Sequence, residues 1–311
     1  MTQASPDASV QGINEAFVLG KCDYFVDVQL WPLRTELDPR GWLRNFAPDE
    51  LEHAVSLLNA FNYFSRRLVD EMFVAAFQQL SVHLISPGEG YLRVQSAWQN
   101  FLQEVIVTHV EGERPSTTDS GYAFARRARQ LLDIPEIQIV PPQEALAKLA
   151  RGGPRPVVFV DDFVGSGNQF KTTWERDMEV QPGLLMSFAR FARLVGGSYY
   201  YCPLLCTQFG KRTIRAACPQ VILLPTHTLD PARDSALGSE SHVWPKHLRP
   251  SAESFLRSAS LRAGIPASGT HGWKGFAELG LTVAFEHSVP DATLPIYYWE
   301  ENGWIPLIRH R

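Results

Sequence analysis

The stretch that decides the fold is Pro156–Gln169, with the sequence PVVFVDDFVGSGNQ. Its opening run, from Pro156 to Val160, carries no charge, which is typical of a strand that is covered on both faces. A pair of carboxylates, a glycine-flanked loop and an amphipathic segment beginning at Asn168 follow in that order. The order predicts a buried strand, a loop of the size that holds a phosphate, and a helix.

The residues after this strand predict a ligand site. Ligands of open parallel sheets bind beyond the carboxyl ends of the strands, so we expect Asp161 and Asp162 to face a crevice. Gly165 and Gly167 flank Ser166 and allow positive φ and a close backbone approach. The first N–H groups of the following helix lack intrahelical acceptors and attract anions. The two acids could accept hydrogen bonds from vicinal hydroxyls while the N–H groups of the loop hold a phosphate. This combination suits a polyol that carries a phosphate.

This pattern resembles the signature of the type I phosphoribosyltransferases. The resemblance implies that Asp161 and Asp162 bind the ribose hydroxyls of 5-phosphoribosyl pyrophosphate (PRPP) and that the loop holds its 5′-phosphate. The loop residues are Gly165, Ser166, Gly167, Asn168 and Gln169. Two positions depart from the family: Gln169 stands where Thr is common, and Gly165 stands where the purine-salvage members carry a base-activating Asp.

A second stretch, Leu281–Trp299, reads LTVAFEHSVPDATLPIYYW. Together with DDFVGSGNQ it resembles the divergent PRTase-CE-like branch of that superfamily, which is found in bacterial conflict and phage-defence gene clusters. The resemblance covers roughly residues 105–299. It implies an antiphage defence effector and a defence-system protein partner, such as a reverse transcriptase or an NTPase.

The polar loop 111–121 is a further candidate site. The corresponding loop of the family holds pyrophosphate, and Ser116, Thr117, Ser120 and the Gly121 N–H are the expected donors here. The alternative is a solvated loop followed by surface arginines on a helix predicted over Ser120–Leu132.

Glu286 and His287 close a predicted strand, and we expect them to line the same crevice as catalytic residues beside Asp161 and Asp162. A lone His is more often structural, which is the competing interpretation. The sequence shows no nucleophile–base pair. The resemblance implies that none is needed, because the reaction passes through an oxocarbenium-like transition state with Mg²⁺ on the departing pyrophosphate. Asp161 and Asp162 are then also the candidate metal ligands.

From residue 105 onward, strands and helices alternate as in a doubly wound, mostly parallel, Rossmann-like α/β sheet. We therefore predict an α/β domain over 105–311 with an inserted hood or flap at about 230–276. Residues 1–104 are predicted to form a mainly helical extension, because apolar residues from Leu51 to Leu80 recur at helical spacing after Pro48. Further strands are predicted at 137–140, 281–285 and 294–299.

Composition narrows the class of protein. The 311 residues carry a formal net charge of −4, which gives no broad basic field and does not favour nucleic-acid binding. No apolar run approaches the ~20 residues of a membrane span, and no signal peptide is evident. The cysteines form no CxxC pair, so we expect reduced thiols and a cytoplasmic protein. They are Cys22, Cys202, Cys206 and Cys218.

Two functions remain open at this point. The first is an enzyme that binds PRPP or a nucleotide with Mg²⁺ and cleaves or transfers at ribose C1′. The second is a catalytically silent module that senses a ribose phosphate or nucleotide and regulates a partner. A nucleoside triphosphatase with Asp161 and Asp162 as its Walker B acids is excluded, because the chain has no GxxxxGK[ST] loop.

Overall fold

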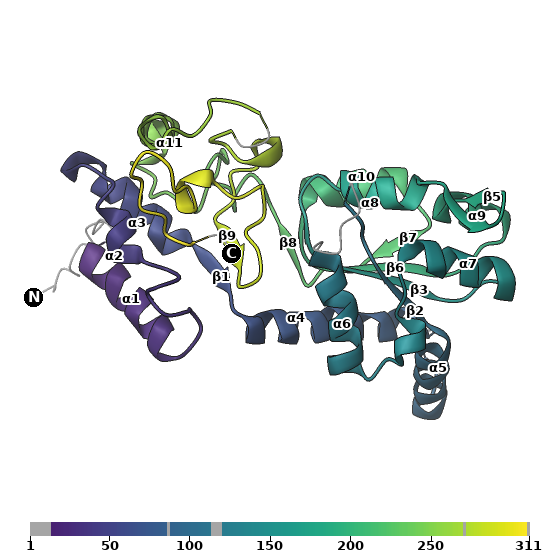
Figure 1. Cartoon of the computed structure of the whole chain (residues 1–311). Coiled ribbons are helices and arrows are strands. Elements are labelled where there is room, and N and C mark those ends of the chain that lie inside the picture. Colours follow the sequence, from purple (N-terminus) through teal and green to yellow (C-terminus); the bar gives the residue numbers. More distant parts are fainter. Residues whose placement is uncertain (1–13, 86–87, 113–119, 270–271, 310–311) are drawn as a thin grey trace, which may run out of the picture. The chain divides into compact units, whose positions relative to one another are not determined.

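The computed structural model describes residues 14–85, 88–112, 120–269 and 272–309 (Figure 1). The chain forms two compact units. Unit 1 combines residues 1–65 with residues 230–311, and unit 2 consists of residues 66–229. In the described part of the chain, none of the helices combines the length and apolar character that a membrane crossing requires.

Unit 2 is built on a five-stranded sheet in which every pairing is parallel. The strands are β2 (Ile106–His109), β3 (Val157–Val164), β6 (Tyr199–Thr207), β7 (Val221–Leu223) and β8 (His227–Leu229). β2, β3 and β6 are neighbours in that order, and β7 and β8 pair with successive parts of β6. The α/β class and the parallel sheet predicted from the sequence are confirmed.

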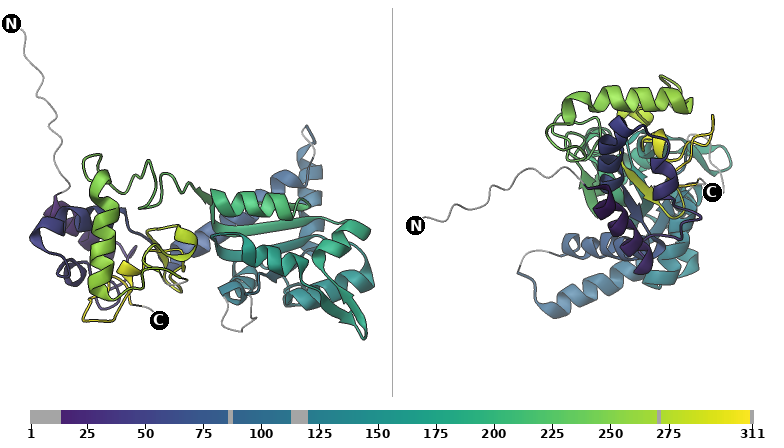
Figure 2. Two further views of the ribbon diagram at one scale, coloured as in Figure 1. Left: turned by 90° about the horizontal axis from the view of Figure 1, so that it is seen from above. Right: turned by 90° about the vertical axis from the view of Figure 1, so that its left-hand side faces the viewer.

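Helices cover both faces of this sheet (Figures 1 and 2). One face carries α4 (Arg66–Gln78), α5 (Tyr91–Glu104) and α6 (Ser120–Leu132), and the other carries α7 (Pro142–Gly152), α8 (Asn168–Glu175), α9 (Phe188–Leu194) and α10 (Gln208–Ala217). Successive tyrosines of β6 contact opposite layers, because Tyr200 meets Phe101 of α5 whereas Tyr201 stacks on Phe170 of α8. Burial on both faces explains why β6 lacks a polar alternation.

The isolated bridge between Val107 and Ile139 shows where the strand order of the sheet reverses. Val107 of β2 pairs with β3 on one side and with Ile139 on the other. The chain therefore passes from β2 to the outer side at Ile139 and then back across to β3. Such a reversal is a topological switch point, where α/β sheets open their ligand crevices. The switch point of unit 2 lies between β2 and β3.

The remaining elements of unit 2 include a hairpin that the sequence analysis missed. It joins β4 (Met178–Gln181) to β5 (Leu184–Met186) through Gly183, whose φ is 78°. The strand predicted at 137–140 is mostly the 3₁₀ turn η3 (Glu136–Gln138). A second 3₁₀ turn, η2 (Gln79–His83), precedes α5, which stands out from the rest of unit 2 (Figure 2).

Unit 1 is formed by segments from both ends of the chain. Its elements are α1 (Glu15–Asp27), α2 (Pro39–Leu43), η1 (Pro48–Glu50), α3 (Leu51–Ala60), β1 (Asn62–Phe64), α11 (Arg249–Ala263), η4 (Phe276–Glu278), β9 (Val283–Phe285) and η5 (Pro295–Tyr297). β1 and β9 pair in parallel, and their register joins Tyr63 to Ala284.

Aromatic side chains hold these two segments together. Trp42 is buried and stacks on Tyr297, with ring centroids 5.5 Å apart. The indole N–H groups of Trp42 and Trp304 both donate to the Ile296 carbonyl, at 2.9 and 3.0 Å. The Tyr297 hydroxyl donates to the carbonyl of Leu57 at 3.0 Å. Each aromatic side chain thus buries apolar area and satisfies its own polar atom.

The structure divides the chain differently from the sequence prediction of a boundary at 104/105. The segment from Val18 to Tyr63 shares a core with the C-terminal segment, whereas α4 and α5 pack on the sheet of unit 2. The Thr226 hydroxyl, for example, donates to the Met72 carbonyl of α4 at 2.9 Å. The division follows contacts between residues far apart in the sequence, which periodicity does not report. Residues 230–276 belong to unit 1, and a hood function for them stays a prediction.

Two predicted elements are also corrected. The helical run predicted from Leu51 to Leu80 is interrupted by β1, because Asn62–Phe64 pairs with β9 and this pairing overrides the local pattern. The strand predicted at 294–299 is the 3₁₀ turn η5. Pro295 offers no N–H to a ladder, and the ring of Tyr297 is turned into the core.

The division into units predicts which fragments fold. We expect residues 66–229 to fold alone, because this fragment keeps the sheet and both helical layers. We expect residues 105–311 not to fold cooperatively, because this fragment loses α1–α3 from unit 1 and α4 from the face of β6. Thermal unfolding followed by circular dichroism measures whether each fragment unfolds cooperatively. A cooperative transition of the 105–311 fragment at the temperature of the intact chain would contradict the division.

Candidate functional site

The acids of the motif lie inside the last part of β3, not beyond its end. The register of β2 with β3 ends at Val160, whereas the register of β6 with β3 continues to Val164. Asp161 and Asp162 therefore lie on β3 just past the paired end of β2, beside the switch point. Both side chains are buried, with 3% and 6% of their surface exposed.

Asp161 is held by two hydrogen bonds. The Tyr201 hydroxyl donates to Asp161 Oδ2 at 2.8 Å, and the Asp162 backbone N–H donates to Oδ1 at 3.0 Å. Burial, and then the neighbouring charge of Asp162, raise the pKa of Asp161 well above its usual range. Burial also raises the pKa of Tyr201, so its hydroxyl remains a donor. Asp161 thus keeps its proton to higher pH than a free aspartate does.

The loop after β3 depends on a close backbone contact with α10. Gly167 has a φ of 80° and forms the N-cap of α8. A Cβ atom on Gly167 would lie 2.8 Å from the Gly210 carbonyl oxygen, and one on Gly210 would lie 2.5 Å from the Gly165 carbonyl oxygen. Gly167 has the positive φ that glycine allows. Gly165 stays out of the left-handed region, and it is the glycine whose backbone α10 approaches closely.

Two helix N-termini meet at this loop. Thr207 caps α10 by accepting from the Gly210 N–H at 2.9 Å, and its hydroxyl donates to the Gly165 carbonyl. α8 begins on the other side, where Asn168 and Gln169 are exposed and the Asn168 N–H donates to Ser166 Oγ at 3.3 Å. The partial positive charges of both helix ends therefore lie beside one short loop.

The first residues of the loop after β2 are bound to the C-terminal end of α8. Arg176, which directly follows α8 as its C-cap, forms an ion pair with Glu111 at 2.8 Å and donates to the Gly112 carbonyl at 2.9 Å. The Thr173 hydroxyl donates to the Glu111 carbonyl at 3.1 Å. Of the predicted donors, Ser116 and Thr117 lie outside the described residues. Ser120 and Gly121 form the start of α6.

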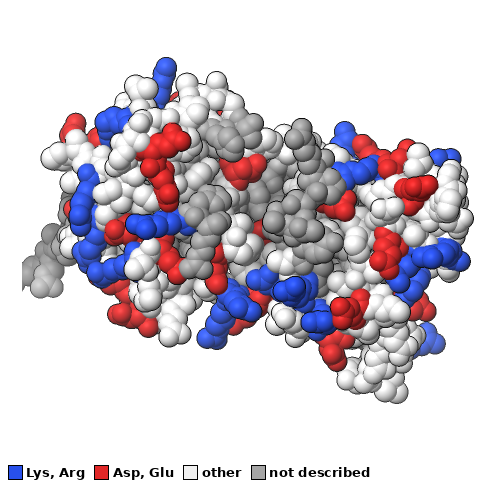
Figure 3. Space-filling view, in the orientation of Figure 1, with Lys and Arg blue, Asp and Glu red and all other residues white. Residues whose placement is uncertain are grey.

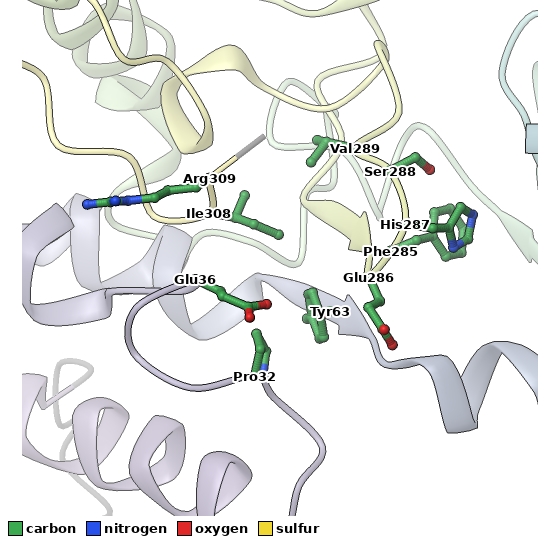
Figure 4. Close-up of a pocket in the computed structure, with 10 residues that line it drawn as sticks. All are labelled: Pro32, Glu36, Tyr63, Phe285, Glu286, His287, Ser288, Val289, Ile308 and Arg309. Atoms are coloured by element: carbon green, nitrogen blue, oxygen red, sulfur yellow. The ribbon is translucent and has the colours of Figure 1, made fainter. Parts of the chain in front are cut away.

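Glu286 and His287 belong to a pocket of unit 1, which has an empty volume of about 350 Å³ including its opening to solvent (Figure 4). Glu36 and Glu286 lie on opposite sides of Tyr63. The pocket is lined by Pro32, Glu36, Tyr63, Phe285, Glu286, His287, Ser288, Val289, Ile308 and Arg309. Because Asp161 and Asp162 belong to unit 2, the structure does not assign the four predicted catalytic residues to one site.

A protein-only metal site does not fit the acids. Within residues 14–85, 88–112, 120–269 and 272–309, no group of three His, Cys, Asp or Glu side chains could hold a metal ion. Both oxygens of Asp161 already accept hydrogen bonds. Magnesium commonly takes one or two carboxylates plus the phosphates of a substrate. A Mg²⁺ ion here would depend on phosphate oxygens from the ligand.

Charges of both signs are mixed on the face of each unit that Figure 3 shows. Lys and Arg side chains lie among Asp and Glu side chains on the visible face of each unit (Figure 3). This mixture agrees with the formal net charge of −4. The cysteines add no reactive group, because Cys22, Cys202, Cys206 and Cys218 are all free and buried.

Three residues of the site were missed in the sequence analysis. Tyr201 holds Asp161, Thr207 joins the loop to α10, and Arg176 anchors the loop after β2. A signal existed for Tyr201, because a tyrosine in a strand buried on both faces needs a partner for its hydroxyl. The partner itself lies on the neighbouring strand and could not be read from local sequence.

The chain was compared with protein families, curated proteins and solved structures. The model of the PRTase-CE family matches residues 39–310, a span that takes in unit 2 and most of unit 1. No curated protein and no solved structure matches the chain.

The loop geometry predicts a cost for a side chain at Gly167. Gly167→Ala meets both a left-handed backbone, about 1–2 kcal/mol, and a clash with Gly210, about 1–3 kcal/mol more. Gly183→Ala is the matched control, since Gly183 has a φ of 78° but no atom within 4 Å of its Cβ position. Urea unfolding measures both variants. Equal losses of stability would show that the contact with α10 is unimportant.

The buried acid predicts a dependence of stability on pH. Because the pKa of Asp161 is raised in the folded protein, its contribution is fully present below the unfolded-state pKa and is lost as pH rises through the folded-state pKa. Asp161→Asn removes that loss. We expect the stability of this variant relative to wild type to increase from about pH 5 to about pH 8 in urea titrations. Asp177→Asn, at an exposed acid of the same unit, is the control, and a constant difference for Asp161→Asn would refute the prediction.

Proposed function

Since the chain belongs to the PRTase-CE family, we propose that unit 2 binds PRPP, or a nucleotide, at the switch point between β2 and β3. The family relationship makes the protein phosphoribosyltransferase-like. The ligand and the reaction at ribose C1′ are the proposal.

The observation that carries the proposal is the meeting of α8 and α10 at one loop beside two acids. A 5′-phosphate is a dianion, and backbone N–H groups at a helix N-terminus are its usual partners. Here Thr207 ties the Gly165 carbonyl to the N-cap of α10, while α8 begins at Gly167. A rigid loop with two positive helix ends favours a phosphate over a neutral ligand.

The acids supply the complementary half of the site. Carboxylate oxygens accept from vicinal hydroxyls, as the 2′ and 3′ hydroxyls of a ribose require. Asp161 and Asp162 directly precede Phe163 and the loop, so a sugar bound by an acid can carry its phosphate toward Gly167. A phosphorylated ribose therefore fits the order of groups along the chain.

The loop that begins at Glu111 is the proposed place of the pyrophosphate. Its first residues are fixed to α8 by Arg176 and Thr173, so the start of this loop and the phosphate loop share a support. Bond breaking at C1′ needs stabilisation of charge more than a nucleophile. Fixed N–H groups and helix ends provide such stabilisation. When bound with the substrate, Mg²⁺ would neutralise charge on the pyrophosphate.

A silent binding module is the second candidate. Gly165 stands where the purine-salvage phosphoribosyltransferases carry a base-activating Asp, and both oxygens of Asp161 are held within the protein. These features favour a site that binds a ribose phosphate and regulates a partner. A role in antiphage defence, with a reverse transcriptase or an NTPase as partner, is compatible with either candidate and stays part of the proposal.

The proposal predicts that the acids are required for binding. Hydrogen bonds to charged groups contribute about 1.5–3 kcal/mol each, so we expect Asp161→Asn with Asp162→Asn to weaken PRPP binding at least about 100-fold. Calorimetric titration with PRPP in the presence and absence of Mg²⁺ measures the affinity, and circular dichroism checks that the variant is folded. The exposed Asp177→Asn is the control.

Retained affinity in the folded double variant would remove the sugar site. Release of pyrophosphate from PRPP by the wild-type protein separates the two candidates. Turnover establishes the enzyme, and binding without turnover under every acceptor tested establishes the sensor.

A further inference from the structure

One helical layer of unit 2 carries an unbalanced charge. Its helices α8, α9 and α10, which we call the basic layer, contain six Lys and Arg side chains and one acid, Glu175. The chain as a whole has a formal net charge of −4, so this layer is basic while the rest of the molecule is acidic. α8 contacts both α9 and α10, and the left view of Figure 2 looks onto the layer. The six cations are Lys171, Arg190, Arg193, Lys211, Arg212 and Arg215.

The cations of the basic layer are not neutralised from within the protein. In the part of the chain that the structure describes, none of the six forms an ion pair. The opposite face of the sheet differs, because two of the arginines of α6 are paired, Arg127 with Asp70 and Arg129 with Glu136. Charges of one sign gathered on a surface attract a ligand of the other sign. The basic layer therefore suits a ligand with several negative charges.

α10 also exposes an aromatic ring beside the loop after β3. Phe209 is the second residue of α10, and 44% of its surface is exposed. Arg212 lies one turn further along the same side of the helix, and Lys211 and Arg215 form a second pair at helical spacing. Proteins that bind single-stranded nucleic acid combine cations that follow the phosphates with aromatic rings on which bases stack. α10 offers both kinds of group within about 15 Å, the length of ten helical residues.

The proposed site limits which part of a strand can enter it. A ribose with both its 2′ and 3′ hydroxyls free occurs in a strand only at the 3′ end of an RNA. The rest of that strand is attached through the 5′-phosphate, the group assigned to the loop after β3. A strand that leaves this loop past the N-terminus of α10 meets Phe209 and Lys211 next. The order of acids, loop and α10 thus matches the order of terminal ribose, 5′-phosphate and preceding nucleotides.

We propose that unit 2 binds the 3′ end of a single-stranded RNA, with the terminal nucleotide in the ribose-phosphate site and the preceding nucleotides on the basic layer. Phe209 stacks on a base, and the cations of α10 bind the phosphates. The inference rests on the proposed function, because it needs the ribose-phosphate site at the switch point. It goes beyond that function by naming a strand as the ligand. The local charge of the basic layer, and not the net charge of the chain, is what favours a nucleic acid.

The test measures RNA binding by the full chain. The probe is a single-stranded RNA of about eight nucleotides with a 5′-fluorescein and a free 3′ diol, followed by fluorescence anisotropy at several salt concentrations. We expect Lys211→Ala, Arg212→Ala and Arg215→Ala together to weaken binding at least about tenfold and to reduce the slope of log K against log salt by about 2. Each phosphate contact on a single strand contributes about 0.7 to this slope. Loss of stacking in Phe209→Ala should weaken binding about tenfold.

Matched controls come from the opposite helical layer. Arg93 and Arg126 are exposed and form no ion pair with the described residues, so Arg93→Ala with Arg126→Ala removes positive charge elsewhere in unit 2. Tyr91→Ala removes an aromatic ring of α5 that is 75% exposed. We expect both controls to bind the RNA as the wild-type protein does. Circular dichroism checks that every variant is folded.

A second comparison tests which end of the strand is bound. The same RNA with a 3′-phosphate has no free diol, and DNA of the same sequence has no 2′ hydroxyl. We expect the wild-type protein to bind either of them at least about tenfold more weakly than the RNA with the free diol. We expect this difference to disappear in Asp161→Asn with Asp162→Asn, because the discrimination is made at the acids.

The other outcomes overturn the inference. Equal RNA affinities of the α10 variant and the Arg93/Arg126 control would remove the basic layer as the RNA surface. Equal affinities for the free diol and the 3′-phosphate would show that the strand does not end in the site. Binding to phosphatidylserine vesicles in place of RNA would assign the layer to a membrane. PRPP binding without RNA binding overturns this inference alone, whereas RNA binding that ignores the acids, with no PRPP binding, overturns the proposed function as well.

Discussion

The close approach of α10 to the loop after β3 is the constraint on which the site depends. The backbone of the loop and the backbone of α10 meet without side chains between them, which only glycine at positions 167 and 210 allows. This contact lets Thr207 serve both as the cap of α10 and as the donor to the Gly165 carbonyl. Because the two helices begin at the same loop, their N–H groups and dipoles act on the same small volume. A larger residue at either glycine would separate the helix ends.

Burial of two adjacent acids has a cost that the fold must offset. Placing a charged carboxylate in an apolar setting is unfavourable, and a second one beside it adds repulsion. Two hydrogen bonds to Asp161 offset part of this cost, one from the Tyr201 hydroxyl and one from the Asp162 backbone N–H. The raised pKa of Asp161 also allows this acid to keep its proton. Natural proteins retain such costs mainly where a function requires the groups. The cost of burying both acids agrees with the ligand site proposed above.

The sequence predicted what is local and missed what is not. The motif strand, the left-handed Gly167 and the bounds of α6 each follow from neighbouring residues, and all three agree with the structure. The division into units cannot be predicted from neighbouring residues. It depends on contacts such as those of Trp42 with Ile296 and of Tyr63 with Ala284, which form only in the folded chain. Tyr201 was missed for the same reason, since its partner is on another strand. The placement of Glu286 with Asp161 stays a prediction, because the two residues belong to different units.

The strand β6 belongs to the candidate site and also contacts the elements at which the chain enters and leaves unit 2. The chain leaves unit 1 after Ser65 and returns at Asp230. The first crossing leads into α4, which packs on β6, and the second follows β8, which pairs with β6 along Leu205–Thr207. The same strand carries Tyr201 and Thr207, which hold the acid and the loop. The elements at both ends of unit 2 therefore contact the same strand that holds the acid and the loop after β3.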